Sequence, residues 1–369
     1  MKLLLIGLDG VRIDLALPAV MDRVPGFAEP DHPADPRFAA EPVPAAQSPS
    51  APAAEPAVDA DPAAEPPSDP VAEPATAPTA PADPLAPTLA RLVDGGAILP
   101  VWMTPPTDSG PGWASLLTGT THEQNNVWWN EFVGHRLART PDLLSQVFFA
   151  DPAARTFAAS TWDALVSATS AGPVIHQRVD QQIGGQHQLF AATDFSRGCR
   201  SADQQVRTRA AWTLNHEGPD AAFVYFEGVD EAGHAHGSTG EEYRQAIRDV
   251  DEHTRYLVKA VSERYEQLGE EWLIAVVTDH GHKDEGGHGE DEVQVRRSFL
   301  ALHAVGPDGA AERLRKQVAD RSVLRSEHVT PLLLELIGVR PGRWEAGHEV
   351  GQLRDVPSVG PTRDLRYEW

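Results

Sequence analysis

Four short stretches of the sequence contain side chains that bind metal ions, each at the end of an apolar run or beside glycine. Together they supply three Asp, three His and one Ser. This mixed oxygen and nitrogen donor set suits two Zn²⁺-like divalent ions with a hydroxyl nucleophile between them. The seven residues are Asp9, Ser109, Asp230, His234, Asp279, His280 and His288.

Each of these residues also has a simpler interpretation when it is taken alone. A serine such as Ser109 is typical of a helix N-cap. Asp230 and His234 are four residues apart, the spacing of a surface pair on one helix face. His282 competes with His288 for the last ligand position. The sequence motifs are therefore weak singly, and their combination predicts the metal site.

Three nearby tryptophans allow two interpretations. Trp113, Trp128 and Trp129 form an apolar wall beside the site, or they pack in the core. The sequence does not decide between these two roles. The segment that begins at Ser109 is expected to be helical, and the free N–H groups at its start favour a bound anion.

Apolar runs that alternate with helical patterns predict the elements that position these residues. We expect strands at residues 3–8, 97–102, 156–160, 221–227, 272–278 and 299–304. We expect helices at residues 87–93, 201–215, 238–268 and 329–337, two of which open with capping-box patterns at Ser201 and Ser238. This alternation predicts the α/β class, with a largely parallel sheet and helices on both faces.

Three of the candidate carboxylates follow three different predicted strands. Asp9, Asp230 and Asp279 come at or just after the carboxyl end of a strand. Open α/β sheets place their sites at that edge. The predicted fold therefore brings together residues that are far apart in the sequence.

Residues 28–87 differ in composition from the rest of the chain. They contain eleven acidic residues and one basic residue, Arg37, which accounts for −10 of the formal charge of −23. A segment so rich in Ala and Pro and so poor in large apolar residues cannot bury enough surface to offset its ordering entropy. We expect a single metallohydrolase domain formed by residues 1–27 and 85–369, interrupted by a disordered insertion at 28–84. A passive spacer is the expected role, and a docking or lid role is the alternative.

The overall composition limits the class of protein. The single Cys199 excludes an intrachain disulfide, and no run approaches the ~18 apolar residues of a membrane span. An acidic chain does not suit a nucleic-acid polymer as partner. The first apolar run is interrupted at Asp9, which favours a buried strand over a signal peptide. The sequence therefore predicts a cytoplasmic protein with a small-molecule substrate, and it does not indicate the oligomeric state.

The order and spacing of the motifs resemble the alkaline phosphatase superfamily, and within it the type I phosphodiesterase/nucleotide pyrophosphatase family. The resemblance covers the chain apart from residues 28–87 and about 135–200. The matching stretches are Leu8-Asp9-Gly10, Ser109 to Gly119, Asp230 to His234 with Gly237, Asp279-His280-Gly281, Gly287-His288-Gly289, and Thr330 to Gly338.

This resemblance implies a fold, a reaction and a set of ligands. It implies an alkaline phosphatase-like enzyme that hydrolyses a phosphate ester through a phospho-Ser109 intermediate, with a phosphodiester as the expected substrate. Asn130 falls where the family has an Asn that helps to hold a phosphate oxygen. One Zn²⁺ ion would take Asp9, Ser109, Asp279 and His280. The other would take Asp230, His234 and His288.

Departures from the family pattern leave the substrate open. The family usually has Thr-x-Pro-Asn-His at the nucleophile, where this chain has Ser109, Gly112 and Trp113. A phosphomonoesterase or a sulfatase of the same superfamily is the alternative, although Trp113 stands where the sulfatase pattern Cys- or Ser-x-Pro-x-Arg has its Arg. A non-catalytic metal-binding protein is a third hypothesis, against which the complete donor set argues.

Overall fold

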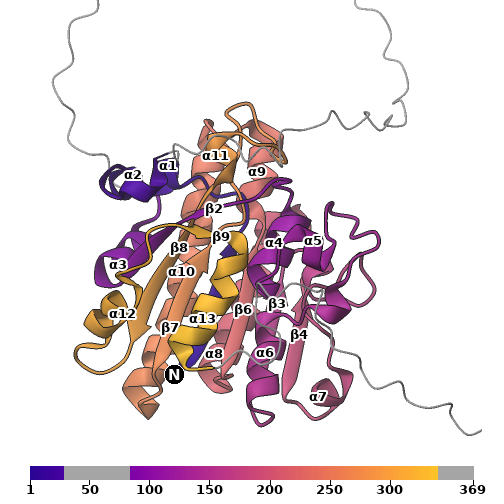
Figure 1. Cartoon of the computed structure of the whole chain (residues 1–369), viewed down its shortest axis with the longest axis vertical. Helices are drawn as coiled ribbons and strands as arrows, with labels where there is room; N and C mark the ends of the chain where they lie inside the picture. The colour runs from indigo at the N-terminus through magenta and orange to yellow at the C-terminus, as the bar shows by residue number, and fades with distance from the viewer. Residues whose placement is uncertain (29–83, 340–369) are drawn as a thin grey trace, which may run out of the picture. The chain divides into compact units, whose positions relative to one another are not determined.

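The strands of the computed structural model, which describes residues 1–28 and 84–339, form an eight-stranded sheet (Figure 1). The strand order is β4-β3-β6-β1-β7-β8-β2-β9. The strands are β1 (Lys2–Leu8), β2 (Ala97–Trp102), β3 (Thr156–Ser160), β4 (His187–Ala191), β6 (Ala221–Phe226), β7 (Trp272–Val277), β8 (Arg297–Val305) and β9 (Leu324–Arg325). The short β5 (Ser196–Gly198) lies outside this order.

The sheet is mixed but largely parallel. Strand β8 runs antiparallel to both of its neighbours, β7 and β2, and the other paired strands are parallel. The predicted α/β class and largely parallel sheet are therefore confirmed. All six strands expected from the sequence are present, whereas β4 and β9 carry no pattern that the sequence analysis recognised.

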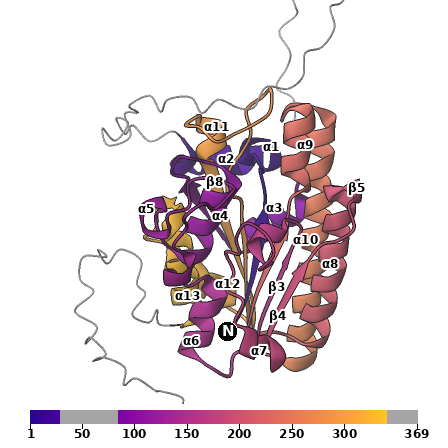
Figure 2. The same ribbon diagram turned by 90° about the vertical axis from the view of Figure 1, so that its right-hand side faces the viewer.

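Helices cover both faces of the sheet, as the view along its edge shows (Figure 2). One layer contains α4 (Ser109–Thr118), α6 (Leu143–Ala150), α12 (Ala310–Val318) and α13 (Val329–Ile337). The other contains α3 (Pro87–Gly95), α8 (Cys199–His216) and α10 (Glu241–Leu268), with α1 (Ile13–Ala16) and α2 (Pro18–Arg23). The remaining helices are α5 (His122–Asn125), α7 (Val179–Ile183), α9 (Gly228–His236) and α11 (Val293–Arg296).

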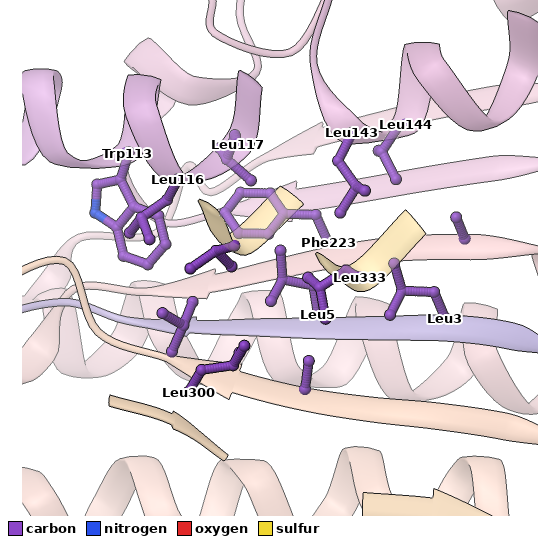
Figure 3. Packing of buried hydrophobic residues seen from close by; sticks show 14 of the residues in the cluster. Leu3, Leu5, Trp113, Leu116, Leu117, Leu143, Leu144, Phe223, Leu300 and Leu333 are labelled. Carbon is purple, nitrogen blue, oxygen red and sulfur yellow. The ribbon is translucent and has the colours of Figure 1, made fainter. Parts of the chain in front are cut away.

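The central strand β1 shows why the sequence needs a continuous apolar run. Leu3 and Leu5 pack into the core on the side of α4 and α6, where Figure 3 shows them on the strand below the helices that carry Leu117, Leu143 and Leu144. Leu4 and the rest of the alternate residues pack into the core on the side of α8 and α10. A strand that is covered on both faces has no solvent-exposed side, so its successive residues are all apolar.

Two predicted helix starts are wrong, and both serines have other partners. Helix α8 begins at Cys199, because the Glu231 carboxylate accepts from the Cys199 N–H at 3.0 and 3.1 Å and satisfies that free donor. Helix α10 begins at Glu241 after Gly240. Ser238 Oγ instead donates to the Lys283 carbonyl at 2.8 Å.

Strand register brings the site to one edge of the sheet. Leu8 of β1 pairs with Phe226 of β6, and Gly7 pairs with Val277 of β7, so three neighbouring strands end at one level. Strand β2 runs in the same direction, because β2 and β7 are each antiparallel to β8. The loop after β2 leads to Ser109 at the start of α4.

The predicted insertion, residues 28–84, lies almost wholly outside the described residues, so the predicted domain boundaries stay a prediction. The final stretch 340–369 also lies outside them. Among the helices of residues 1–28 and 84–339, none is both long and apolar enough to cross a membrane.

Candidate metal centre

The structure brings all seven predicted residues together at the carboxyl edge of the sheet. Two sets of side chains lie close enough together to hold an ion, Asp230 with His234, His282 and His288, and Asp230 with Asp9 and His280, so Asp230 is within reach of both. We divide the seven predicted residues into two groups, as the family resemblance implies. The first, called the inner group, consists of Asp9, Ser109, Asp279 and His280. The second, called the outer group, consists of Asp230, His234 and His288.

The inner group is almost completely buried. Asp279 and His280 are inaccessible to solvent, and Asp9 and Ser109 are 1% and 5% exposed. His280 Nε2 lies 3.3 Å from Asp9 Oδ1, 3.3 Å from Asp279 Oδ2 and 3.2 Å from Ser109 Oγ. Three oxygen atoms from three different elements therefore surround one imidazole nitrogen.

The three separations from His280 Nε2 match the distance between two donor atoms of a tetrahedral ion. Bonds of about 2.0–2.1 Å place the donor atoms of such an ion about 3.3 Å apart. Asp9 Oδ1 and Asp279 Oδ2, the two oxygens that face His280, have no hydrogen-bond partner in the described part of the chain. Buried carboxylate oxygens are rarely left unpaired, because burial without a partner is costly. The residues present therefore fit a divalent cation.

Without a cation the inner group is electrostatically unfavourable. Burial, and then the charge of Asp230, raise the pKa of Asp9 to about 7. Burial and the charges of Asp9 and Asp230 raise the pKa of Asp279 well above its usual range. Burial also lowers the pKa of His280 well below its usual range, so this imidazole is a neutral donor.

The outer group lies at the surface of a cavity. Asp230 Oδ1 is 3.3 Å from His288 Nε2 and 3.5 Å from His234 Nε2, and the two Nε2 atoms are 3.0 Å apart. The His234 side chain is 52% exposed, whereas that of His288 is 5% exposed. Helix α9 carries Asp230 and His234 on one face, as their four-residue spacing predicts.

Charge in the outer group is compensated from within. Burial opposes ionisation of Asp230, yet hydrogen bonds with His282 and His288 lower its pKa below the usual range. Burial disfavours the charged form of His288, but its contacts with Asp230 raise the pKa of this imidazole. Histidines thus stabilise the one carboxylate of this group.

The structure places both candidates for the last ligand beside Asp230. His288 Nε2 faces Asp230 Oδ1 from the cavity side, and His282 Nε2 lies 2.8 Å from the same oxygen. His282 is fully buried. The sequence analysis treated His282 and His288 as rivals for one ligand position, whereas both imidazoles lie close to Asp230.

The structure confirms the core interpretation for Trp113 and adds a polar contact. Trp113 is fully buried, and its Nε1–H donates to Asp9 Oδ2 at 3.0 Å. Tyr225 Oη donates to the same oxygen. A Cβ on Gly7 of β1 would lie 2.5 Å from the Trp113 ring, so only glycine leaves room for the indole there. Trp113 is therefore a core residue that also orients a candidate ligand.

The start of α4 offers fewer free donors than the sequence suggests. The Gly110 N–H donates to Asn130 Oδ1 at 2.7 Å, and Pro111 has no N–H. Asn130 and Ser109 both line the cavity. Asn130 therefore lies beside Ser109, and its side-chain carbonyl oxygen holds the turn at the start of α4.

A cavity of about 370 Å³ lies against the two groups, and no Lys or Arg of residues 1–28 and 84–339 lines it. Glu227 lines it, and burial, followed by the charges of Asp9 and Asp230, raises the pKa of Glu227 to about 8. The sequence analysis missed Glu227 and Tyr225 because both lie in an apolar strand and its end. The residues that line the cavity are Ser109, Asn130, Glu131, Trp162, Ala171, Tyr225, Glu227, Asp230, His234 and His288.

The chain belongs to the family "Type I phosphodiesterase / nucleotide pyrophosphatase", whose sequence profile matches residues 79–317. The resemblance expected from the sequence motifs is thereby confirmed. A stretch of 129 residues is 26% identical to human "GPI ethanolamine phosphate transferase 1". That stretch is 32% of this chain and only 14% of the length of the human protein.

Solved structures share the fold at low sequence identity. Human ectonucleotide pyrophosphatase/phosphodiesterase 5 has a TM-score of 0.52 at 12% identity, covering 94% of this chain and 97% of that one. The 2-O GAG sulfatase BT1596 has a TM-score of 0.54 at 13% identity, covering 94% and 72%. A putative sulfatase from Bacteroides thetaiotaomicron has a TM-score of 0.55 at 10% identity, covering 95% and 73%. The alkaline phosphatase-like fold is thus confirmed.

Proposed function

We propose that this protein is a phosphodiesterase that holds two divalent ions, Zn²⁺ being the expected metal, and acts through a covalent phospho-Ser109 intermediate. The observation that carries the proposal is the inner group. Two buried carboxylate oxygens without partners and a serine hydroxyl surround His280 Nε2 at the separations of a metal site.

The donor set supports one ion per group. Asp9, Ser109, Asp279 and His280 would hold the first, and Asp230, His234 and His288 the second, as the family resemblance implies. When bound, the ions would supply Lewis-acid charge that activates a hydroxyl and stabilises phosphoryl oxygens. The family of this chain and the pattern of unpaired oxygens support this assignment.

Ser109 is the nucleophile in this proposal. Its Oγ would form a bond to phosphorus as the bond to the leaving-group oxygen breaks, and water would later release the phosphoryl group from Ser109. Asn130 would keep the Ser109–Gly110 turn in place through the Gly110 N–H, and its NH₂ group would donate to a phosphate oxygen. The burial of Ser109 limits competing reactions with bulk water.

The cavity favours a diester over a monoester. A phosphodiester carries one negative charge, whereas a monoester carries a second that needs a cationic partner. Among the described residues, no Lys or Arg lines the cavity, and Glu131 adds a carboxylate to it. With Ser109 neutral, two divalent ions exceed the three ligand carboxylates by one charge, which matches a diester.

The fold does not discriminate between a phosphodiesterase and a sulfatase, since both occur among the similar structures. Trp113 replaces the Arg of the sulfatase pattern, and its indole binds Asp9. The activity and substrate of the human transferase relative belong to a much longer protein. The cytoplasmic location stays a prediction.

A panel of three chromogenic substrates tests the proposed function. Purified protein loaded with Zn²⁺ is assayed with bis-p-nitrophenyl phosphate, p-nitrophenyl phosphate and p-nitrophenyl sulfate. We expect kcat/KM for the diester to exceed that for the monoester and the sulfate by at least about tenfold, or about 1.4 kcal/mol in transition-state stabilisation. A larger kcat/KM for either of the other two substrates contradicts the phosphodiesterase proposal.

A further inference from the structure

His282 is a buried imidazole at the centre for which the proposed ion ligands leave no role. It has no solvent-accessible surface, and its Nδ1 has no hydrogen-bond partner among the described residues. Its Nε2 lies 2.8 Å from Asp230 Oδ1. His282 does not line the cavity that Asp230, His234 and His288 line.

Two glycines leave room for the His282 ring. A Cβ on Gly233 of α9 would lie 2.6 Å from the ring, and one on Gly10 would lie 2.9 Å from its Nε2. Non-bonded atoms do not approach a Cβ this closely without a shift in structure. The imidazole is therefore enclosed between the backbone after β1 and the backbone of α9, beside Asp230.

The backbone at His282 is also held in place. Arg12 Nη1 donates to Ser238 Oγ at 2.9 Å and lies 3.4 Å from the His282 carbonyl oxygen. Ser238 Oγ donates in turn to the neighbouring Lys283 carbonyl at 2.8 Å. Ring and backbone are thus fixed by independent contacts, which is the condition for one side chain to orient another.

We propose that His282 is a positioning residue that donates its Nε2–H to Asp230 Oδ1 and fixes this carboxylate for the ion of the outer group. The inference rests on the proposed function, since it requires that Asp230 bind an ion. Hydrogen-bond partners behind a ligand orient it and raise the metal affinity of the site. Asp230 is within reach of both groups, so its orientation affects the whole centre.

The geometry favours this role over that of a fourth ligand. His282 lies close enough to Asp230, His234 and His288 to be considered with them, but its 2.8 Å contact is an ordinary hydrogen-bond length and it does not line the cavity as the other three do. A fourth protein ligand would also close the position that a catalytic ion keeps open for its substrate. His282 and His288 therefore have different roles, one orienting Asp230 and one binding the ion.

Two substitutions at this position separate a hydrogen-bond donor from a ligand. His282→Met fills the space with an apolar chain, and His282→Gln keeps an N–H donor while removing the imidazole. The two stepwise Zn²⁺ dissociation constants are measured by competition with a chromogenic chelator. His236→Gln is the matched control, because His236 is an exposed residue at the end of the same helix α9.

We expect His282→Met to raise one of the two dissociation constants about 10–100-fold and to leave the other within about threefold. His282→Gln should restore that constant to within about tenfold of wild type. Both variants should still bind two ions at saturating Zn²⁺ with an unchanged circular dichroism spectrum. The control should match wild type.

Other outcomes overturn the inference. Equal weakening by Met and Gln would make His282 a ligand, and wild-type affinity in both variants would deny it any role at the ion. If one of the two variants does not fold, the other is used alone. Its Zn²⁺ dissociation constants must then still change as stated above for that variant. Wild-type protein that binds no Zn²⁺ would refute the proposed function instead, which keeps the two failures distinct.

Discussion

The inner and outer groups of the candidate centre differ in how the negative charge of their carboxylates is compensated. The inner group combines two buried carboxylates with one imidazole and a hydroxyl, and nothing within it compensates the negative charge. The outer group combines one carboxylate with two imidazoles, and His282 lies beside that carboxylate. One group therefore depends on a cation, and the other is already neutralised by its neighbours.

This difference indicates that the two ions would have different roles. The inner group is closed to solvent and contains the proposed nucleophile, so its ion would be an integral part of the site. The outer group faces the cavity through the exposed His234, so its ion would meet the substrate and exchange more readily. Each prediction below tests one side of this comparison.

The largest expected effect concerns the nucleophile of the inner group. Ser109→Ala should lower kcat at least about 10³-fold, because the hydroxyl is the group positioned for attack while three other inner donors remain. Steady-state assays with bis-p-nitrophenyl phosphate and metal analysis provide the two measurements. The total number of bound ions should change little.

Ser109→Thr is the matched control, since it retains a hydroxyl at the same position. It should keep more activity than Ser109→Ala by at least about tenfold. If the Ser109→Ala variant retained most of the wild-type turnover, this result would falsify the covalent mechanism and favour attack by water. A trapped phosphoserine at residue 109 after rapid quenching would support the mechanism.

A smaller effect is expected when one hydrogen bond behind the inner group is removed. Tyr225→Phe deletes only the hydroxyl that donates to Asp9 Oδ2, while Trp113 still donates to the same oxygen. We expect the dissociation constant of the inner ion to rise about tenfold, the lower end of effects seen for such partners. The outer ion should be unaffected.

Chelator competition measures both constants for this variant. Tyr256→Phe provides the control, because the Tyr256 side chain is partly exposed on α10, away from the candidate ligands. If both dissociation constants rise equally in Tyr225→Phe, the inner and outer groups do not bind their ions independently. Unchanged affinity would mean that Trp113 suffices to orient Asp9.

The smallest effect should appear in the metal-free protein as a function of pH. The pKa of Asp9 is raised to about 7, so its contribution to stability is present at low pH and is lost as the pH rises through about 7. The pKa of Asp230 is lowered, so its contribution is lost only at acid pH, as the pH falls. Protein treated with EDTA should therefore become less stable between pH 5 and pH 8.

Thermal unfolding of the metal-free protein measures this slope. We expect the midpoint of wild type to fall by about 4 °C or more across that range, and the fall to be reduced in Asp9→Asn. Asp230→Asn should reduce the fall only in part, because burial, the larger cause of the raised pKa of Asp9, remains when the charge of Asp230 is removed. An identical slope in wild type and Asp9→Asn would show that Asp9 is not the source.

Much of the fold was predictable because strands buried on both faces need continuous apolar runs. Leu3–Leu8 and Trp272–Thr278 are such runs, and the polar residues that end them, Asp9 and Asp279, belong to the candidate centre. Strand β4 was missed because its sequence, His187 to Ala191, is only half-buried at the edge of the sheet and has no apolar run.

The serines at predicted helix starts show the limit of local patterns. A capping box at Ser238 is plausible within the sequence alone, but Arg12 and the Lys283 carbonyl compete for the same hydroxyl. Those partners are more than forty residues away in either direction. Contacts at such distance decide which local preference is realised.

By itself, the sequence determined the donor types of the centre and the strand ends that carry them, because residue chemistry and apolar periodicity are local properties. Only the tertiary structure showed that His282 and His288 reach the same oxygen of Asp230, and that Trp113 binds Asp9. The physical reason is that a metal site is defined by separations of about 3 Å between atoms of distant segments. Strand register and helix packing set those separations, and no local pattern encodes them.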